Sequence, residues 1–163
     1  MNIHDDHMYH GAALTQIADH PAFKAINAFR GINARGAFRI NDRIGIFIKH
    51  ATKPTKAFQE YVFTFNTKNQ QELTELKTRC DKVFVVLVCI QARSICCITV
   101  EEFDKHVEAR AADFGGSEPQ YQLLVTAKPG RSFRVYMNAA GRKGKMLIRT
   151  IVSRNAFPKM IFE

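Results

Sequence analysis

Hydrophobic and polar positions along the chain follow both helical and strand-like spacing, which predicts a fold that mixes helices with a β-sheet. Residues 83–90 are apolar without interruption. A continuous run of this length is typical of a strand covered on both faces, so we expect it in the middle of the sheet. Two β-rich segments, 37–40 and 44–50, flank the turn-forming residues 41–43 and predict a hairpin.

Other segments predict the helices and strands that surround this central strand. Apolar residues at helical spacing predict a helix over 11–20, and a second helix that begins at Pro21 and ends at Gly31. Capping-box patterns at Thr67 and Thr99 predict helices that run to about residues 80 and 112. Segments rich in β-branched and aromatic residues predict further strands at 60–65, 94–98, 121–126, 132–137 and 146–152.

The order of these elements defines the expected fold class, which is α/β or α+β. We expect a mixed central β-sheet flanked by helices, with a β-rich C-terminal extension. The chain has 163 residues, which is the length of one domain. We therefore expect a single domain over 1–163, made of an α/β core at 10–112 and a basic, β-rich portion at 120–163.

The charge of the chain is concentrated in its last quarter. The sequence has 24 Lys and Arg against 15 Asp and Glu, and residues 120–163 contain nine basic residues and only one acidic residue, a balance of +8. Such a segment favours a polyanionic partner, and nucleic acid in particular. The predicted phosphate contacts are Lys128, Arg131, Arg134, Arg142, Lys143, Lys145 and Arg149, and Arg154 extends this set.

Glycine and aromatic residues in the same segment support this prediction. The glycines leave the backbone open to close approach by a phosphate. Aromatic residues alternate with the cations and would stack on exposed bases if they faced outward. They are Tyr121, Phe133 and Tyr136. Two alternatives remain open, namely a solvated basic face in which Phe133 is buried and a docking face for an acidic protein.

The start of the chain and its apolar runs bear on localisation. Residues 1–10 are polar and include two aspartates, unlike the basic and then apolar start of a secretory signal. The longest apolar run has about eight residues, whereas a membrane-spanning helix needs roughly 20. We expect a cytoplasmic protein without a membrane partner. Its four cysteines, at 80, 89, 96 and 97, are expected to be reduced, and their spacing does not match a structural zinc site.

The order of helix, hairpin, strand, helix and strand within residues 11–112 resembles the core order of restriction-endonuclease-like folds. Nucleases of that superfamily carry an Asp on the second strand and an acid-x-Lys triplet on the third, where the two carboxylates hold a divalent cation and the Lys helps position or activate the attacking water. The resemblance implies Asp42, Lys49 and Glu60 as candidate catalytic residues, with Mg²⁺ as the cofactor. Here Asp42 precedes the second strand, and Val62 stands where the triplet has its lysine. The alternative makes Asp42 a turn residue, Glu60 a charge at a strand edge and Lys49 a solvated strand end.

A second resemblance is to an uncharacterised family of small bacterial proteins. It extends over residues 37–98 and rests on the amino-acid sequences of four segments. They are 45–50 (GIFIKH), 63–65 (FTF), 83–89 (VFVVLVC) and 95–97 (ICC). This resemblance implies a recurring framework of strands and no particular activity.

The N-terminal segment is rich in metal-ligating side chains. It contains His4, Asp5, Asp6, His7 and His10, with His20 farther on. These side chains can bind zinc or nickel, but a chain terminus rarely supplies a fixed geometry. We therefore predict a mobile tail that binds metal weakly and assign no metal site. His50 and His106 are isolated in the sequence, and no glycine-rich motif indicates a nucleotide cofactor.

Together these patterns favour a nucleic-acid-binding protein that contacts phosphates through its C-terminal basic residues. Two other classes remain as alternatives. The first is a divalent-metal-dependent nuclease that uses Asp42, Lys49 and Glu60. The second is a protein-interaction or structural module that forms a homodimer through an exposed strand edge or an apolar surface.

Overall fold

A computed structural model describes residues 1–29, 31–32 and 34–163 of the chain. This part of the chain forms three α-helices, nine strands and one short 3-10 helix. The helices are α1 (Asp5–Ala18), α2 (Thr67–Arg79), α3 (Val100–Phe114) and the 3-10 helix η1 (Lys159–Phe162). The strands are β1 (Ile26–Ala28), β2 (Ala37–Ile40), β3 (Ile44–Ala51), β4 (Glu60–Asn66), β5 (Lys82–Cys89), β6 (Ser94–Thr99), β7 (Gln120–Thr126), β8 (Phe133–Ala139) and β9 (Arg142–Val152).

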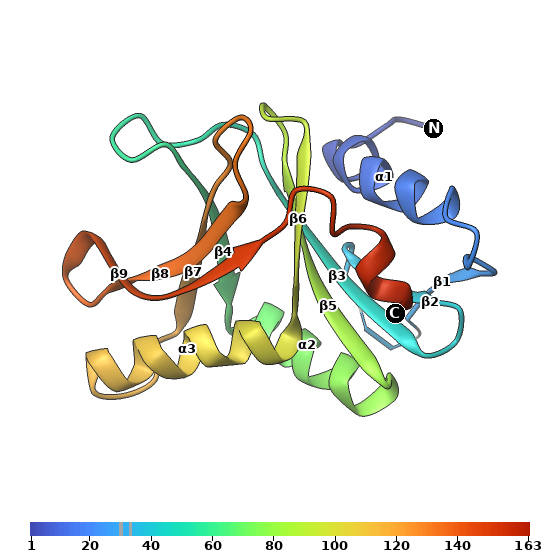
Figure 1. Cartoon of the computed structure of the whole chain (residues 1–163). Coiled ribbons are helices and arrows are strands. Elements are labelled where there is room, and N and C mark those ends of the chain that lie inside the picture. The colour runs from blue at the N-terminus through green and yellow to red at the C-terminus, as the bar shows by residue number, and fades with distance from the viewer. Residues whose placement is uncertain (30, 33) are drawn as a thin grey trace.

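The strands form two sheets. The first has the order β1-β2-β3-β5-β6 and is mixed, because β3 and β5 run parallel while its other pairs are antiparallel. The second has the order β4-β7-β8-β9 and is antiparallel throughout. Figure 1 shows α3 running below the second sheet, and α1 on the side of the first sheet that faces away from the second. The predicted class, a mixed sheet flanked by helices with a β-rich C-terminal part, is confirmed.

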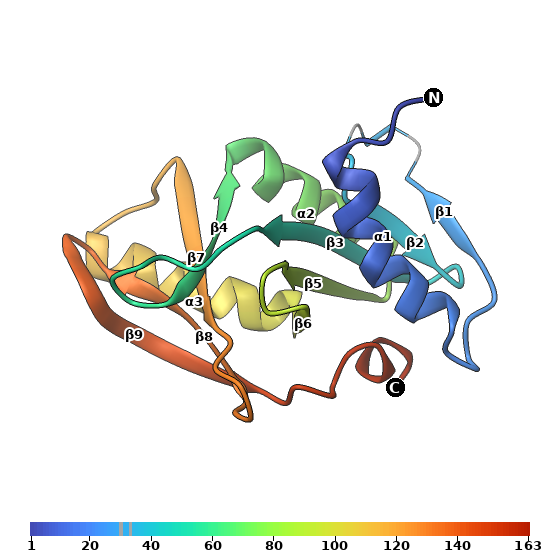
Figure 2. The same ribbon diagram turned by 90° about the horizontal axis from the view of Figure 1, so that it is seen from above.

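The central position predicted for the apolar run is also confirmed. Strand β5 lies between β3 and β6, and residues 83–89 are all buried. Both faces of the sheet are covered, because alternate residues of β5 belong to different hydrophobic clusters. Val85 and Leu87 pack toward the second sheet and α3, whereas Val86 and Val88 pack in the cluster that contains Ala13 and Ile17 of α1. Figure 2 shows α1 lying across the first sheet.

Side-chain caps determine where the second and third helices begin. The Asn66 side chain accepts a hydrogen bond from the backbone N–H of Asn69 at the start of α2, and Thr99 accepts one from Glu102 at the start of α3. Helix α3 ends at Gly115, which adopts φ 88°, a left-handed conformation that glycine reaches without strain. The predicted capping box at Thr99 and Glu102 is therefore confirmed, and α2 is capped one residue earlier than the sequence indicated.

The helix predicted to begin at Pro21 is wrong. Residues 26–28 form the edge strand β1, which pairs with β2. The side chain of Asn41 forms hydrogen bonds with backbone groups just before this strand. Its Oδ1 accepts from the N–H groups of Lys24 and Ala25, and its Nδ2 donates to the Ala22 carbonyl. These long-range bonds replace the bonds that a helix would have made.

The first helix begins six residues before the predicted position. It starts at Asp5, so the histidine-rich segment is helical and not a mobile tail. His10, Ala13 and Ile17 form its buried face at helical spacing. The last strand is likewise longer than predicted, since β9 begins at Arg142.

A restriction-endonuclease-like fold is not confirmed. Apart from β1, which stands between the first helix and the hairpin, the predicted order of elements is present, but β4 does not extend the sheet that contains β2 and β3. It pairs with β7 in the second sheet, with Phe63 opposite Leu123. Within the described residues, no helix is both long enough and apolar enough to cross a membrane.

Candidate functional site

A cleft opens beside β3 where its neighbour β2 is too short to cover it. The pairing of β2 with β3 reaches Phe47, opposite Ala37, and beyond this point the Ile48 N–H donates to the Gly36 carbonyl at 2.8 Å. Residues of α1, β3 and α2 line the cleft, whose volume is about 510 Å³. It therefore collects polar side chains from three elements that are distant in the sequence.

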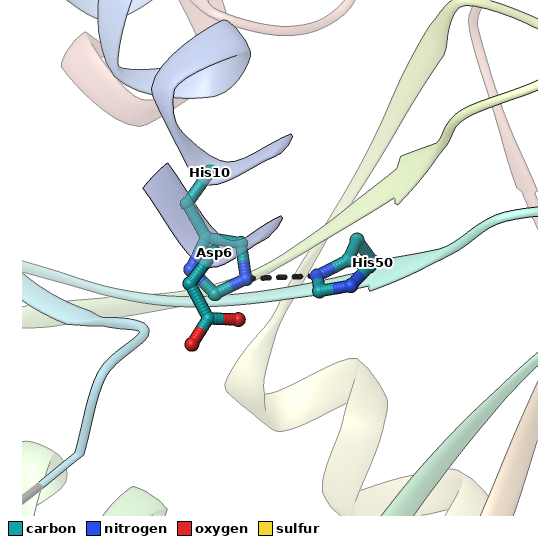
Figure 3. Close-up of side chains that lie close together, drawn as sticks. All are labelled: Asp6, His10 and His50. Atoms are coloured by element: carbon teal, nitrogen blue, oxygen red, sulfur yellow. Dashed lines mark hydrogen bonds between the residues drawn. The ribbon is translucent and has the colours of Figure 1, made fainter. Parts of the chain in front are cut away.

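On one wall of the cleft, Asp6, His10 and His50 come together (Figure 3). The Nε2 atom of His10 lies 3.2 Å from the Nδ1 atom of His50, and one ligand atom from each of the three residues lies within 4.8 Å of the other two. Asp6 and His10 are one turn apart on α1, so helical geometry places them on the same face. Among the described residues, these three form a cluster whose potential ligand atoms are close enough to hold one metal ion.

Packing fixes the two imidazole rings. The His50 ring lies between those of Tyr9 and His10, with centroids 4.8 Å and 5.3 Å away. His10 is only 7% exposed, and it lies so close to Gly36 that a Cβ atom there would be 3.4 Å from its Cε1 atom. Burial lowers the pKa of His10, and the Asp6 carboxylate acts in the opposite direction. The ring is therefore favoured in its neutral form, which is the form that binds metals.

The opposite wall of the cleft is built around Lys49. Its Nζ donates to the Thr64 carbonyl and, at 3.0 Å, to Oδ1 of Asn69, and it lies 5.0 Å from the centroid of the Phe65 ring. Asn69 in turn donates to Oε1 of Glu72 at 3.2 Å. Burial lowers the pKa of Lys49, while Glu72 raises it.

The two walls lie on opposite sides of the same strand. Successive side chains of a strand point to opposite faces, so Lys49 is directed toward α2 and His50 toward α1. Arg35 joins the mouth of the cleft and forms an exposed ion pair with Asp6 at 3.4 Å. The cleft thus combines metal-ligating groups with cations, a set suited to binding a metal ion and an anion.

The structure does not bring the three predicted catalytic residues together. Asp42 is exposed in the β2–β3 turn, whereas Lys49 lies near the other end of β3. Seven residues separate them, which corresponds to about 23 Å in an extended strand. Glu60 begins β4 in the second sheet and is buried, where it accepts a hydrogen bond from the Tyr136 hydroxyl. Burial, followed by the effect of Glu60, raises the pKa of Tyr136. Of the three, only Lys49 lines the cleft.

The predicted phosphate contacts lie in the β7–β8 turn, on β8 and along β9 of the second sheet. All seven are exposed, and none of them forms an ion pair or side-chain hydrogen bond with any residue in the described ranges. We call them the basic surface: Lys128, Arg131, Arg134, Arg142, Lys143, Lys145 and Arg149. Arg154 differs, because it is partly buried and its guanidinium lies 4.6 Å from the centroid of the Phe133 ring.

The predicted stacking residues are not available to bases. Tyr121, Phe133 and Tyr136 are at most 5% exposed, because Tyr121 and Phe133 face the core and Tyr136 is covered where it meets Glu60. The exposed aromatic residue beside the basic surface is instead Phe58, at 47%. It lines a groove of about 200 Å³ together with Lys128, Arg131 and Arg134. A single aromatic residue in the polar loop before β4 was the only sequence signal for it.

Nothing in the sequence indicated that His10 and His50 lie side by side in the cleft. His50 lies 40 residues from His10, and its neighbours in β3 give no sign of a ligand. Only the packing of α1 against β3 brings the two imidazoles together. Comparisons of the chain with protein-family models, with curated proteins and with solved structures found no match.

Proposed function

We propose that the protein binds nucleic acid through its basic surface. The observation that carries the proposal is that seven exposed cations lie on adjoining strands and turns without an acidic partner in the described part of the chain. Cations on a protein surface are commonly neutralised by neighbouring carboxylates. A surface that lacks such neighbours attracts the phosphate backbone, and releasing the counterions of that backbone favours binding.

The register of the second sheet supports a continuous contact. Arg134 pairs with Ile151 and Tyr136 pairs with Arg149, so the two arginines lie on the same face of β8 and β9. Diagonal neighbours of this kind are about 7–8 Å apart. Long guanidinium side chains at this separation can contact the same strand of phosphates.

The groove beside these arginines adds a place for a base. Phe58 offers an exposed ring there, and Lys128 and Arg131 lie in the same groove. Gly144 lies against the edge atoms of this ring, because a Cβ atom at this position would lie 2.8 Å from Cε1 of Phe58. Aromatic stacking next to cations is typical of proteins that bind single-stranded nucleic acid. We therefore expect single strands to bind at least as tightly as duplex.

The homodimer alternative has a different observation in its favour. In the described chain β9 pairs with β8 alone, and its open edge exposes Met146, Ile148 and Ile151. The same strand also carries four exposed cations of the basic surface. A second copy paired along this edge would bring like charges together, and charged edge strands are a common guard against such pairing. The charge thus favours the nucleic-acid proposal over the homodimer.

A charge-reversal experiment tests the proposal. Fluorescence anisotropy would measure the affinity of the chain for single-stranded DNA, duplex DNA and RNA of random sequence, without metal and then with Mg²⁺. Reversing Arg131, Arg134 and Lys143 to Glu should weaken binding by at least about tenfold, because each removes a phosphate contact. The control reverses Lys24, Lys68 and Lys105, which are exposed outside the basic surface and change the net charge equally. Equal losses in both variants would contradict the proposal.

A further inference from the structure

We propose that Asp6, His10 and His50 form a binding site for one divalent transition-metal ion, with zinc as the ion that fits best. This inference is independent of the proposed nucleic-acid binding. It rests on three potential ligands from two separate elements, with their ligand atoms within 4.8 Å of one another. Figure 3 shows the facing imidazole nitrogens with the Asp6 carboxylate beside them.

The separation of the two nitrogens matches the geometry of zinc. Zinc binds imidazole nitrogen at about 2.0–2.1 Å, so two nitrogens 3.2 Å apart subtend an angle of about 100° at the ion. This angle is close to the tetrahedral value. The ion would lie to one side of the line between His10 Nε2 and His50 Nδ1, because the midpoint of their 3.2 Å separation is too close to both nitrogens for a zinc bond. Asp6 lies within reach and needs only to turn its carboxylate from Arg35 toward the ion.

The nature of the ligands selects the metal class. Two imidazoles and one carboxylate suit zinc and similar transition metals, whereas Mg²⁺ and Ca²⁺ prefer oxygen ligands. A set of three protein ligands leaves a fourth position for water or for an anion. The ligands line the cleft into which Lys49 and Arg35 also project, so an anion in that position would meet cations.

The burial of His10 is a second, independent observation. The ring is only 7% exposed, and its Nε2 atom lies 3.2 Å from Nδ1 of His50. A buried imidazole nitrogen needs a polar partner, and a metal ion bound by both nitrogens would supply one. Asp6 and His50 are partly buried, so the ion would be reached from the cleft. The pair is also held in place by Tyr9 and by the close approach of Gly36.

Zinc titration of the untagged, chelator-treated chain tests the site. Isothermal calorimetry should show one equivalent of zinc bound tightly, and Co²⁺ in its place should give the visible absorption of a tetrahedral site. Replacing either His10 or His50 by Gln should weaken binding by at least about a hundredfold, because even outer residues of such sites contribute 10- to 100-fold. Asp6→Asn should also weaken zinc binding. This variant removes the charge of the side chain with almost no change in its shape.

The matched control removes the other N-terminal histidines. His4 is the N-cap of α1 and His7 lies in its first turn, and both are exposed and lie outside the cluster. The double variant His4→Gln with His7→Gln should keep the tight equivalent. Circular dichroism of every variant confirms that it is folded. Undiminished binding in His50→Gln, loss of binding in the control, or absence of a tight equivalent in the parent chain would each overturn the proposal, because each points to the exposed terminus or to no site.

Discussion

The Nε2 atom of His106 lies 2.8 Å from the Oγ1 atom of Thr150, and this contact joins α3 to β9. His106 is 1% exposed. Burial lowers its pKa below the ordinary value of 6.5, and Glu102 opposes this effect. The neutral ring is thus part of the interface between the helix and the second sheet.

Acid should destabilise the protein through this residue. The pKa of His106 is lower in the folded chain than in the unfolded chain, where it is about 6.5. Its contribution to the free energy of unfolding is therefore fully present above pH 6.5. The contribution is lost as the pH falls from 6.5 through the pKa of the folded chain, because the unfolded chain is protonated first. The free energy of unfolding should fall by at most about 1.4 kcal/mol per pH unit from this one group. Urea unfolding of the parent and of His106→Gln between pH 7.5 and 5 would measure this. Parallel pH curves for the two proteins would contradict the prediction.

The buried pair of Tyr136 and Glu60 should be important for stability. Replacing Tyr136 by Phe removes a hydroxyl that donates to a carboxylate only 4% exposed. We expect the free energy of unfolding to fall by about 1–3 kcal/mol, because the acceptor stays buried without this donor. Combining the substitution with Glu60→Met should recover much of the loss, since both polar partners are then gone. Urea denaturation measures both effects, and a Tyr136→Phe variant as stable as the parent would show that the bond contributes nothing.

Gly36 should be sensitive to the smallest substitution. A Cβ atom at this position would lie 2.3 Å from the Ile48 carbonyl oxygen. Gly36→Ala therefore forces β3 away from the segment that leads into β2. We expect a loss of about 1–3 kcal/mol in the free energy of unfolding. Gly11→Ala is the matched control, because nothing lies within 4 Å of its Cβ and alanine favours the helix by about 0.5–1 kcal/mol. Equal stability of the two variants would refute the close contact.

The cysteine thiols should react slowly in the folded chain. Burial raises the pKa of Cys89 to about 12 and that of Cys96 and Cys97 well above the usual range. Only Cys80 is partly exposed, and burial raises its pKa to a lesser degree. A thiol reagent at pH 8 should modify at most one thiol promptly and all four in denaturant. Prompt reaction of two or more thiols in the native chain, or of any in Cys80→Ser, would disagree with this burial.

Phe58 should matter for single strands more than for duplex. If its ring stacks on a base, Phe58→Ala should weaken binding of single-stranded DNA or RNA by about 1–3 kcal/mol and leave duplex affinity nearly unchanged. Phe58→Tyr should retain the affinity. Phe114→Ala is the control, since Phe114 is also exposed, at 53%, but lies at the end of α3. A loss that is equal for single strands and duplex would exclude stacking at this position.

Local sequence patterns were sufficient to predict most of the elements. The apolar run of β5, the β2–β3 hairpin and the cap at Thr99 depend on neighbours in the chain, and all three are confirmed. The pattern could not show that β4 pairs with β7, because its alternation suits either sheet. Nor could it show that Asn41 would bond to residues 22–25 and replace the predicted helix.

The candidate sites were predictable to different extents. The basic surface follows from charge alone, since Lys and Arg are nearly always solvent-exposed. Whether an aromatic residue of a strand faces water depends on sheet packing, so the sequence could offer Tyr136 as a stacking residue only on the condition that it faced outward, and it is buried. The contact between His10 and His50 requires α1 to lie on β3, which no local pattern encodes.

Binding of nucleic acid through the basic surface is best tested by its salt dependence, measured by fluorescence anisotropy with single-stranded nucleic acid. The parent chain is compared with the variant in which Arg131, Arg134 and Lys143 are reversed to Glu. The affinity of the parent should decline steeply with salt. The slope for the variant should be smaller by roughly 0.7 for each lost phosphate contact. Absence of binding at low salt, or identical slopes in the two proteins, would contradict nucleic-acid binding through the basic surface.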